Sequence, residues 1–293
     1  MSSNAGAGGF GPNPWQQTSW DWRAAGNFIG GGLGSGLLIT SVLFAAFNPG
    51  GAGALGWMLF VGLAMVSVGL LCVWLEIGRP LRAIHVFFNP RTSWMSREGF
   101  VALLLFPAGL LAMLGVSASL WAMAGLAAAF LYCQSRMLPA ARGIPAWRPV
   151  RLIPLMFVTG LTEGCGAYLL LGLWHQQAGG VAMLVAALLV LVRWVVWVRY
   201  RRAVDASLAP RARVALDVAG RRLLRVGSIL PLLVLALGAG FTTGATQMTL
   251  AAFAGACAVF AGAAMKYTLV TRASFNQGFA LTRIPVRGVR SPN

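Results

Sequence analysis

Eight long apolar runs dominate this chain of 293 residues. A helix that crosses the hydrocarbon core of a bilayer needs about 20 apolar residues. Only 10% of the residues are charged, against about 25% in a typical soluble domain. The sequence therefore predicts an all-α, polytopic membrane bundle of eight transmembrane helices, at about residues 24–47, 54–75, 99–116, 118–138, 151–174, 179–199, 226–244 and 247–270.

Three parts of the chain are expected: an N-terminal cytoplasmic or interfacial segment (1–23), the transmembrane domain (24–270) and a C-terminal cytoplasmic tail (271–293). The first part lacks the basic start and the cleavage site of a secretory signal peptide, so we expect no removal. Its tryptophans are typical of a membrane interface. The third and fourth runs lie so close together that they can also be read as one helical hairpin with a very short turn.

Basic residues set the expected orientation. With eight spans, the two termini and the connections 2–3, 4–5 and 6–7 lie on one side of the membrane. Counted together with the adjoining helix ends, these segments hold all 23 lysines and arginines. Cytoplasmic loops collect these residues, so both termini are expected in the cytoplasm. Because the net charge of +17 lies between apolar runs rather than on a soluble face, it does not indicate binding of nucleic acid.

Cysteine and histidine are too few and too scattered for a resident redox centre. The four cysteines fall inside predicted spans and form no CxxC pair, whereas iron–sulfur and zinc sites need clustered thiolates. We interpret them as small buried apolar side chains. A haem held by two histidines is also not expected, because His85 and His175 fall at opposite faces of the membrane. No metal site is predicted.

The connection between the second and third spans is unusually polar. It reads WLEIGRPLRAIHVFFNPRTSWMSREGF from Trp74 to Phe100 and combines Glu76, His85 and Glu98 with four arginines. Those arginines exclude a lipid-exposed helix in hydrocarbon. We predict a folded segment on the cytoplasmic side, with RPLRAIHVFF as a short amphipathic helix along the interface and Ser93 or Ser96 capping the third span.

Together with the basic residues of 142–151 and 193–225, this connection predicts a broad positive cytoplasmic face. Such a face suits a negatively charged soluble partner, and attraction to anionic lipid explains part of the charge too. The arginines proposed for docking are Arg79, Arg82, Arg91, Arg97 and Arg148.

Two features inside the spans have open interpretations. Glu163 falls in the middle of the fifth span, where a carboxyl group usually faces a cavity or a partner. It is either a protonated side chain hydrogen-bonded between helices or part of a proton path. The first span carries glycines at small-xxx-small spacing, as at Gly26, Gly30 and Gly34, which indicates close helix packing or, alternatively, room for a flat ligand.

Several of these motifs resemble the NrfD/DmsC/PsrC family of membrane anchor subunits, which serve molybdopterin iron–sulfur oxidoreductases. The resemblance is carried by GRP after the second span, SWMSRE before the third and SRM followed by IPAW after the fourth. WDWRAAGNFIGGGLGSG and KYTLVTRASFNQGFAL are most similar to the membrane subunit of phenylacetyl-CoA:acceptor oxidoreductases. One departure concerns Glu76, because the dimethyl sulfoxide reductase anchors have a histidine there that is tied to quinol binding.

The resemblance implies an electron-transfer subunit of the bacterial inner (plasma) membrane, non-catalytic by itself, without haem or iron–sulfur cluster. It implies a quinone (menaquinone or ubiquinone) bound near the face where a four-cluster ferredoxin-like iron–sulfur subunit docks, with a molybdopterin catalytic subunit beyond. Proton transfer to a quinone needs a titratable group within hydrogen-bond reach. The expected quinone-binding and proton-transfer residues are Glu76, Glu98, His85, Asn27, Arg23, Tyr132 and Arg136, with Glu163 as a candidate proton path.

Two other functions stay open at this point. A secondary transporter is the first, although discontinuous helices in corresponding positions of two halves are not evident. A structural anchor that holds a soluble enzyme at the membrane without touching quinone is the second. The substrate of the catalytic partner and the direction of electron flow do not follow from the residues, although a cytoplasmic CoA thioester substrate favours quinone reduction.

Overall fold

A computed structural model of the chain describes residues 13–47, 52–77, 80–175 and 179–278. This part contains helices and no strand, and eight helical segments are long and apolar enough to cross a membrane. The expected all-helical bundle with eight candidate spans is thus confirmed. Its α-helices are α1 (Trp22–Phe47), α2 (Ala52–Glu76), α3 (Trp94–Met113), α4 (Ser117–Ala140), α5 (Leu152–His175), α6 (Gly180–Val204), α7 (Pro210–Leu224), α8 (Leu230–Phe241) and α9 (Gly244–Tyr267).

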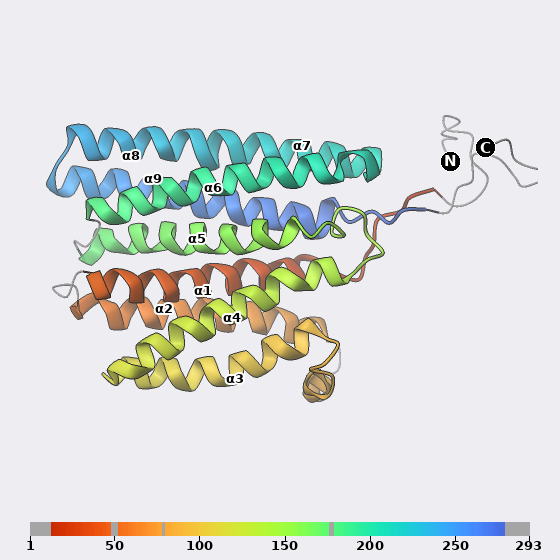
Figure 1. The fold of residues 1–293 in the computed structure, drawn as a ribbon, viewed down its shortest axis with the longest axis horizontal. Helices are drawn as coiled ribbons and strands as arrows, with labels where there is room; N and C mark the ends of the chain where they lie inside the picture. The colour runs from red at the N-terminus through yellow and green to blue at the C-terminus, as the bar shows by residue number, and fades with distance from the viewer. Residues whose placement is uncertain (1–12, 48–51, 78–79, 176–178, 279–293) are drawn as a thin grey trace, which may run out of the picture.

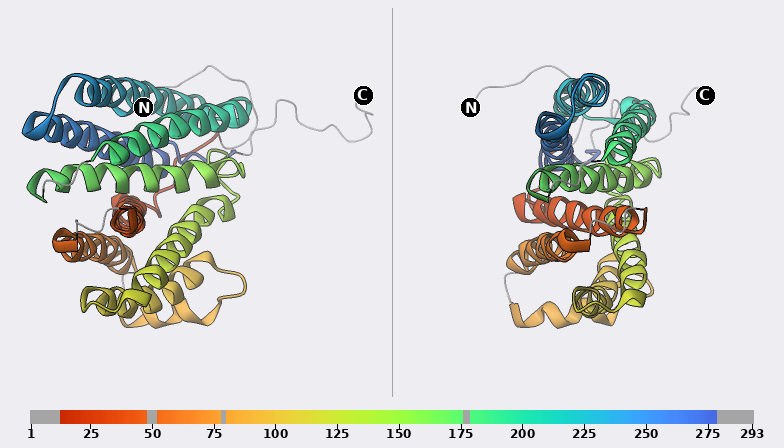
Figure 2. Two further views of the ribbon diagram at one scale, coloured as in Figure 1. Left: turned by 60° about the vertical axis from the view of Figure 1, so that its left-hand side comes forward. Right: turned by 90° about the vertical axis from the view of Figure 1, so that its left-hand side faces the viewer.

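Helix α1 lies at the centre of the bundle, with α2, α3 and α4 on one side and α5 to α9 on the other (Figures 1 and 2). The connections α2–α3, α4–α5 and α6–α7 lie at one end, which we call the basic end (Figure 1). Both described ends of the chain lie there too, and they pair where Gln17 N donates to Ser274 O at 3.0 Å and Asn276 N donates to Trp15 O at 3.0 Å. From the positive-inside rule, we expect the basic end to face the cytoplasm.

Three span boundaries differ clearly from those expected, and one is the end of α6, at Val204 rather than near residue 199. Span three begins at Trp94 rather than near residue 99, because Ser93 caps the helix by accepting a hydrogen bond from Ser96 N at 3.3 Å. The seventh span begins at Pro210 rather than near residue 226, since α7 continues through a π-helical turn (η4, Arg225–Ile229) into α8. The apolar run starts only at residue 226, so a hydropathy profile does not reveal the polar helix α7 that precedes it.

The polar connection after α2 contains the short helix η2 (Pro80–Phe88), which is 3₁₀-helical. Figure 1 shows it end-on below the right-hand end of α3, so it runs across the axes of the spans. This agrees with the expected short helix along the interface. Ile84 and Phe88 on it are exposed.

Glycines allow α1 to occupy the central position. A Cβ at Gly30 would lie 2.8 Å from Met65 O in α2, and one at Gly36 would collide with Gly160 O in α5. The packing interpretation of the small-residue spacing is therefore correct at these positions. Gly31 and Gly32 differ, because a Cβ there would meet the polar side chains of Gln134 and Lys266.

Two of the basic residues counted with the basic end are buried inside the bundle. Arg193 is 0% exposed and Lys266 is 1% exposed, and both lie within helices, α6 and α9. Side chains on a helix tilt toward its N-terminus. Helix α9 runs toward the basic end (Figure 1), so Lys266 is directed back into the bundle.

Candidate functional site

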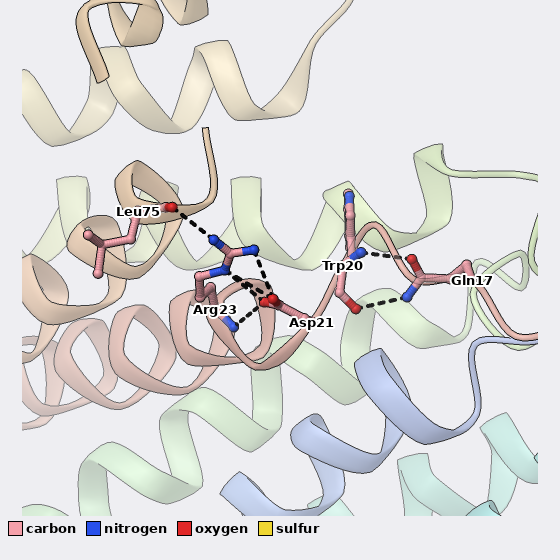
Figure 3. A network of polar contacts seen from close by, with 5 residues as sticks. All are labelled: Gln17, Trp20, Asp21, Arg23 and Leu75. Atoms are coloured by element: carbon pink, nitrogen blue, oxygen red, sulfur yellow. Dashed lines mark hydrogen bonds and ion pairs between the residues drawn. The ribbon is translucent and has the colours of Figure 1, made fainter. Parts of the chain in front are cut away.

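The start of α1 is fixed by a small polar network at the basic end, shown in Figure 3. Asp21 accepts hydrogen bonds from the Arg23 backbone and forms an ion pair with its guanidinium at 2.9 Å. Arg23 Nη1 also donates to Leu75 O at 2.9 Å, which ties α1 to the last turn of α2. The hydrogen bond from Arg23 holds the pKa of Asp21 below its ordinary value. Arg23 therefore binds the α2 backbone at Leu75, the residue before Glu76.

A buried cluster of one carboxyl and two amide side chains joins three helices. Asn27 from α1, Glu98 from α3 and Gln134 from α4 are each 2% exposed. Asn27 Nδ2 donates to Glu98 Oε1 at 3.4 Å. Gln134 Nε2 donates to Asn27 O at 2.9 Å and to Asn27 Oδ1 at 3.3 Å. We call these three residues the amide–carboxyl cluster.

Two cavities lie beside this cluster. The small cavity, of about 110 Å³, is lined by Asn27, Phe28 and Glu76 among others. The large cavity, of about 480 Å³, lies between α2, η2 and α3, and Glu98 is the one carboxyl group among the residues that line it. Both cavities are bounded by the apolar residues Val73, Ile77 and Met95. Asn27 therefore borders one cavity and is hydrogen-bonded to the acid of the other.

The walls of the large cavity are suited to an apolar ligand with one polar end. Apart from Glu98 and the Trp74 indole, its lining is aliphatic or phenyl. Leu103 on this wall is 57% exposed and Trp74 is 44% exposed, so the cavity reaches the outer surface of the bundle. A quinone fits this arrangement, since its ring needs a hydrogen-bond partner and its isoprenoid tail needs an apolar exit.

Arg23 lines neither cavity, and three other expected quinone residues also lie outside both. His85 is exposed on η2, with its Nδ1 3.0 Å from Arg82 O. Tyr132 is 42% exposed, and its hydroxyl accepts a hydrogen bond of 3.5 Å from Arg136. The Arg136 guanidinium in turn stacks 4.7 Å from the centre of the Trp94 ring. The structure thus gathers Asn27, Glu76 and Glu98 and leaves these three on the surface of the same end.

The arginines proposed for docking from the sequence lie at the basic end as far as they are described. Arg82, Arg91 and Arg148 are exposed. Arg97 is half-buried, donates to Pro90 O at 2.8 Å and stacks 4.1 Å from the Trp94 ring centre. Arg79 lies outside the described residues.

Glu163 is completely buried and ion-paired. Lys266 Nζ lies 2.5 Å from Glu163 Oε2 and donates to Phe28 O at 2.8 Å. Arg193 lies close enough to Glu163 for a charge–charge interaction. We call Glu163, Arg193 and Lys266 the buried charge cluster. It had not been predicted, although Lys266 is the only lysine of the chain and lies inside the last apolar run.

Gln134 was also missed as a site residue, because a glutamine within an apolar span gives no chemical signal of its own. The described cysteines agree with their interpretation as packing residues, since Cys133, Cys165 and Cys257 are buried and Cys72 is partly buried. Within the described ranges, no three His, Cys, Asp or Glu side chains are grouped so that they could hold a metal ion.

Comparison with protein-family models finds no match to this chain. Comparison with curated protein sequences likewise finds no significant match.

Proposed function

We propose that this chain is the quinone-reactive membrane anchor subunit of a molybdopterin iron–sulfur oxidoreductase. It would pass electrons between an iron–sulfur subunit at the basic end and the membrane quinone pool. The observation that carries the proposal is the buried Glu98 carboxyl, which is hydrogen-bonded to Asn27 and lines an apolar cavity beside α2 and α3. Motif resemblance supports the assignment to the NrfD/DmsC/PsrC family.

The positions of the three site residues suit proton-coupled chemistry. A bound quinone supplies a two-electron, two-proton couple. Glu98 would hold the proton that a quinone oxygen exchanges, because a general acid must lie within hydrogen-bond reach of the reacting atom. The Asn27 amide orients the Glu98 carboxyl. Glu76 lines the small cavity at the basic-end turn of α2 and would exchange protons with the aqueous side.

The proposal puts the partner that supplies electrons at the basic end. This chain has no clustered cysteine ligands for an iron–sulfur centre, so the proposal assigns electron delivery to a ferredoxin-like iron–sulfur subunit. Exposed arginines such as Arg82, Arg91 and Arg148 would attract its acidic surface. The large cavity includes Ala83, Val86 and Phe87 of η2, so a subunit docked on η2 would lie directly beside the quinone ring. In this proposal the partner docks on the cytoplasmic side of the bacterial inner membrane. A catalytic partner that acts on a cytoplasmic CoA thioester would deliver electrons to the quinone, so the reaction would be quinone reduction.

Substitution of the two glutamates in the assembled complex tests the proposal. Glu98→Gln should lower quinone-coupled turnover by about 10²-fold or more, since a positioned general acid typically contributes 10²–10⁴-fold. Glu76→Gln should slow turnover less, because water in the small cavity can still deliver protons. Asp217→Asn is the matched control, since Asp217 pairs with Arg201 away from both cavities. Normal turnover in assembled Glu98→Gln and Glu76→Gln complexes would refute the proposed site.

The same experiment separates the alternatives. A structural anchor without a quinone site predicts that both glutamate variants assemble and retain quinone-coupled turnover. A secondary transporter predicts solute movement in liposomes by the purified chain without any partner. No observation in the described structure favours either of them over the quinone site.

A further inference from the structure

Helix α1 separates two buried polar clusters, and consecutive backbone carbonyls connect it to both. Asn27 O accepts from Gln134 of the amide–carboxyl cluster at 2.9 Å. Phe28 O accepts from Lys266 of the buried charge cluster at 2.8 Å. Gly31 and Gly32, one turn further along, leave the space that the Gln134 and Lys266 side chains fill. The carbonyl that binds the Lys266 cation and the carbonyl that binds the Gln134 amide thus belong to adjacent residues of α1.

Charges in the buried charge cluster do not balance. With ordinary protonation states, Arg193 and Lys266 carry two positive charges against the single carboxylate of Glu163, a net charge of +1. All three side chains are 0–1% exposed. No other acidic residue forms an ion pair with these two cations, because the aspartates pair at the basic end and Glu76 and Glu98 lie at the two cavities.

Arg193 is held in place by backbone rather than by a second acid. Its Nη1 donates to Ala258 O at 2.8 Å, and its Nη2 donates to Gly227 O at 2.5 Å. Gly227 lies in η4, and π-helical turns are often found at functional sites. A charge inside a membrane protein is costly and usually has a function. Packing of α6 against α9 would not require an uncompensated cation.

We propose that the buried charge cluster is an electrostatic element of the quinone site, which favours negative charge on a headgroup oxygen held at Glu98 in the large cavity. This inference rests on the proposed function. A quinone oxygen is negative after an electron has arrived from the iron–sulfur donor and before a proton has arrived from Glu98. The cluster contacts α1 at Phe28 O, one residue after Asn27, whose amide donates to Glu98, so its net positive charge acts across α1 on an oxygen held at Glu98.

The expected effect is large enough to measure. Helices are about 10 Å across, so the cluster and the ligand are separated by about that distance. With an effective dielectric constant of about 20, one unit charge at this distance changes the affinity for an anion on the order of tenfold. A neutral ligand of the same shape should respond to the charge far less.

The proposal is tested with variants of the full-length chain, purified in detergent, that differ in the net charge of the buried charge cluster. The probes are 2-hydroxy-1,4-naphthoquinone, which is an anion at neutral pH, and the neutral 2-methyl-1,4-naphthoquinone, with binding read from quenching of tryptophan fluorescence. Glu163→Gln should strengthen binding of the anion about tenfold, and Lys266→Met should weaken it about tenfold. The double variant keeps the net charge and should bind the anion like the wild type. Binding of the neutral probe should stay constant throughout.

Opposite changes in the affinity for the anion in the two single variants distinguish an electrostatic effect from damage to the packing. If both variants shift the two probes in the same direction and by the same factor, the role is structural and the proposal is wrong. If a single variant does not fold, the Glu163→Gln/Lys266→Met double variant is compared with one that also carries Arg193→Met, which should lose about tenfold in affinity for the anion. If neither probe binds to the wild-type chain, the proposed quinone site itself is wrong, and this inference is wrong with it.

Discussion

Replacing Gly36 by alanine should force α1 away from α5. The added Cβ would collide with Gly160 O and would lie 3.1 Å from Gly164 Cα. Both obstacles are backbone atoms of α5, which cannot turn aside as a flexible side chain can. Overpacking of this kind typically destabilises a protein by about 1–3 kcal/mol, and here it would separate the two helices that position Phe28 and Glu163.

Gly125→Ala is the matched control for this variant. Gly125 lies in the middle of α4, and a Cβ there would meet nothing within 4 Å. Since alanine favours a helix over glycine by about 1 kcal/mol, this variant should be as stable as the wild type or slightly more stable. The assay is thermal unfolding of the purified chain in detergent, followed by circular dichroism. Equal midpoints for the Gly36 and Gly125 variants would refute the packing of α1 against α5.

Three further predictions concern single groups. Ser93→Ala should lower stability by about 1 kcal/mol through loss of the α3 cap, and an unchanged unfolding midpoint would contradict that role. Because the folded-state pKa of Asp21 is lowered, its contribution to stability is present above its unfolded pKa and is lost as pH falls through the folded pKa. Wild type should therefore lose more stability in acid than Asp21→Asn, and parallel pH profiles would argue against the Asp21–Arg23 pair. If Glu163 belongs to a proton path, Glu163→Gln should change the number of protons moved per electron pair in vesicles of the assembled complex, and an unchanged number would remove that role.

The spans could be predicted because each depends on a property of its own residues. Length and hydropathy located the eight apolar helices, and proline and arginine placed the connection after α2 outside the hydrocarbon. The start of α7 at Pro210 was missed because its residues are polar. A polar helix that continues into an apolar one does not show in a hydropathy profile. Gly30 and Gly36 revealed packing through their spacing, but the spacing does not name the partner helix.

Contacts between helices could be predicted only in part. Asn27, Glu76 and Glu98 were chosen because they are polar residues near one end of the bundle, and the structure places them beside adjoining cavities. The partners of buried groups depend on which helices are neighbours, which no local pattern specifies. Lys266 was therefore counted with the basic residues of the C-terminal end, and its ion pair with Glu163, 103 positions away in the sequence, was not foreseen.

Photolabelling with an azido derivative of a membrane quinone tests the central claim most directly. The full-length chain in lipid is illuminated with the label, digested, and its peptides are mapped by mass spectrometry. The account predicts label on the walls of the large cavity, within residues 70–77, 83–87 and 95–107, and loss of that label when excess unlabelled quinone is present. Label confined to the outer surfaces of α6 and α8, or label that excess quinone does not displace, would contradict it.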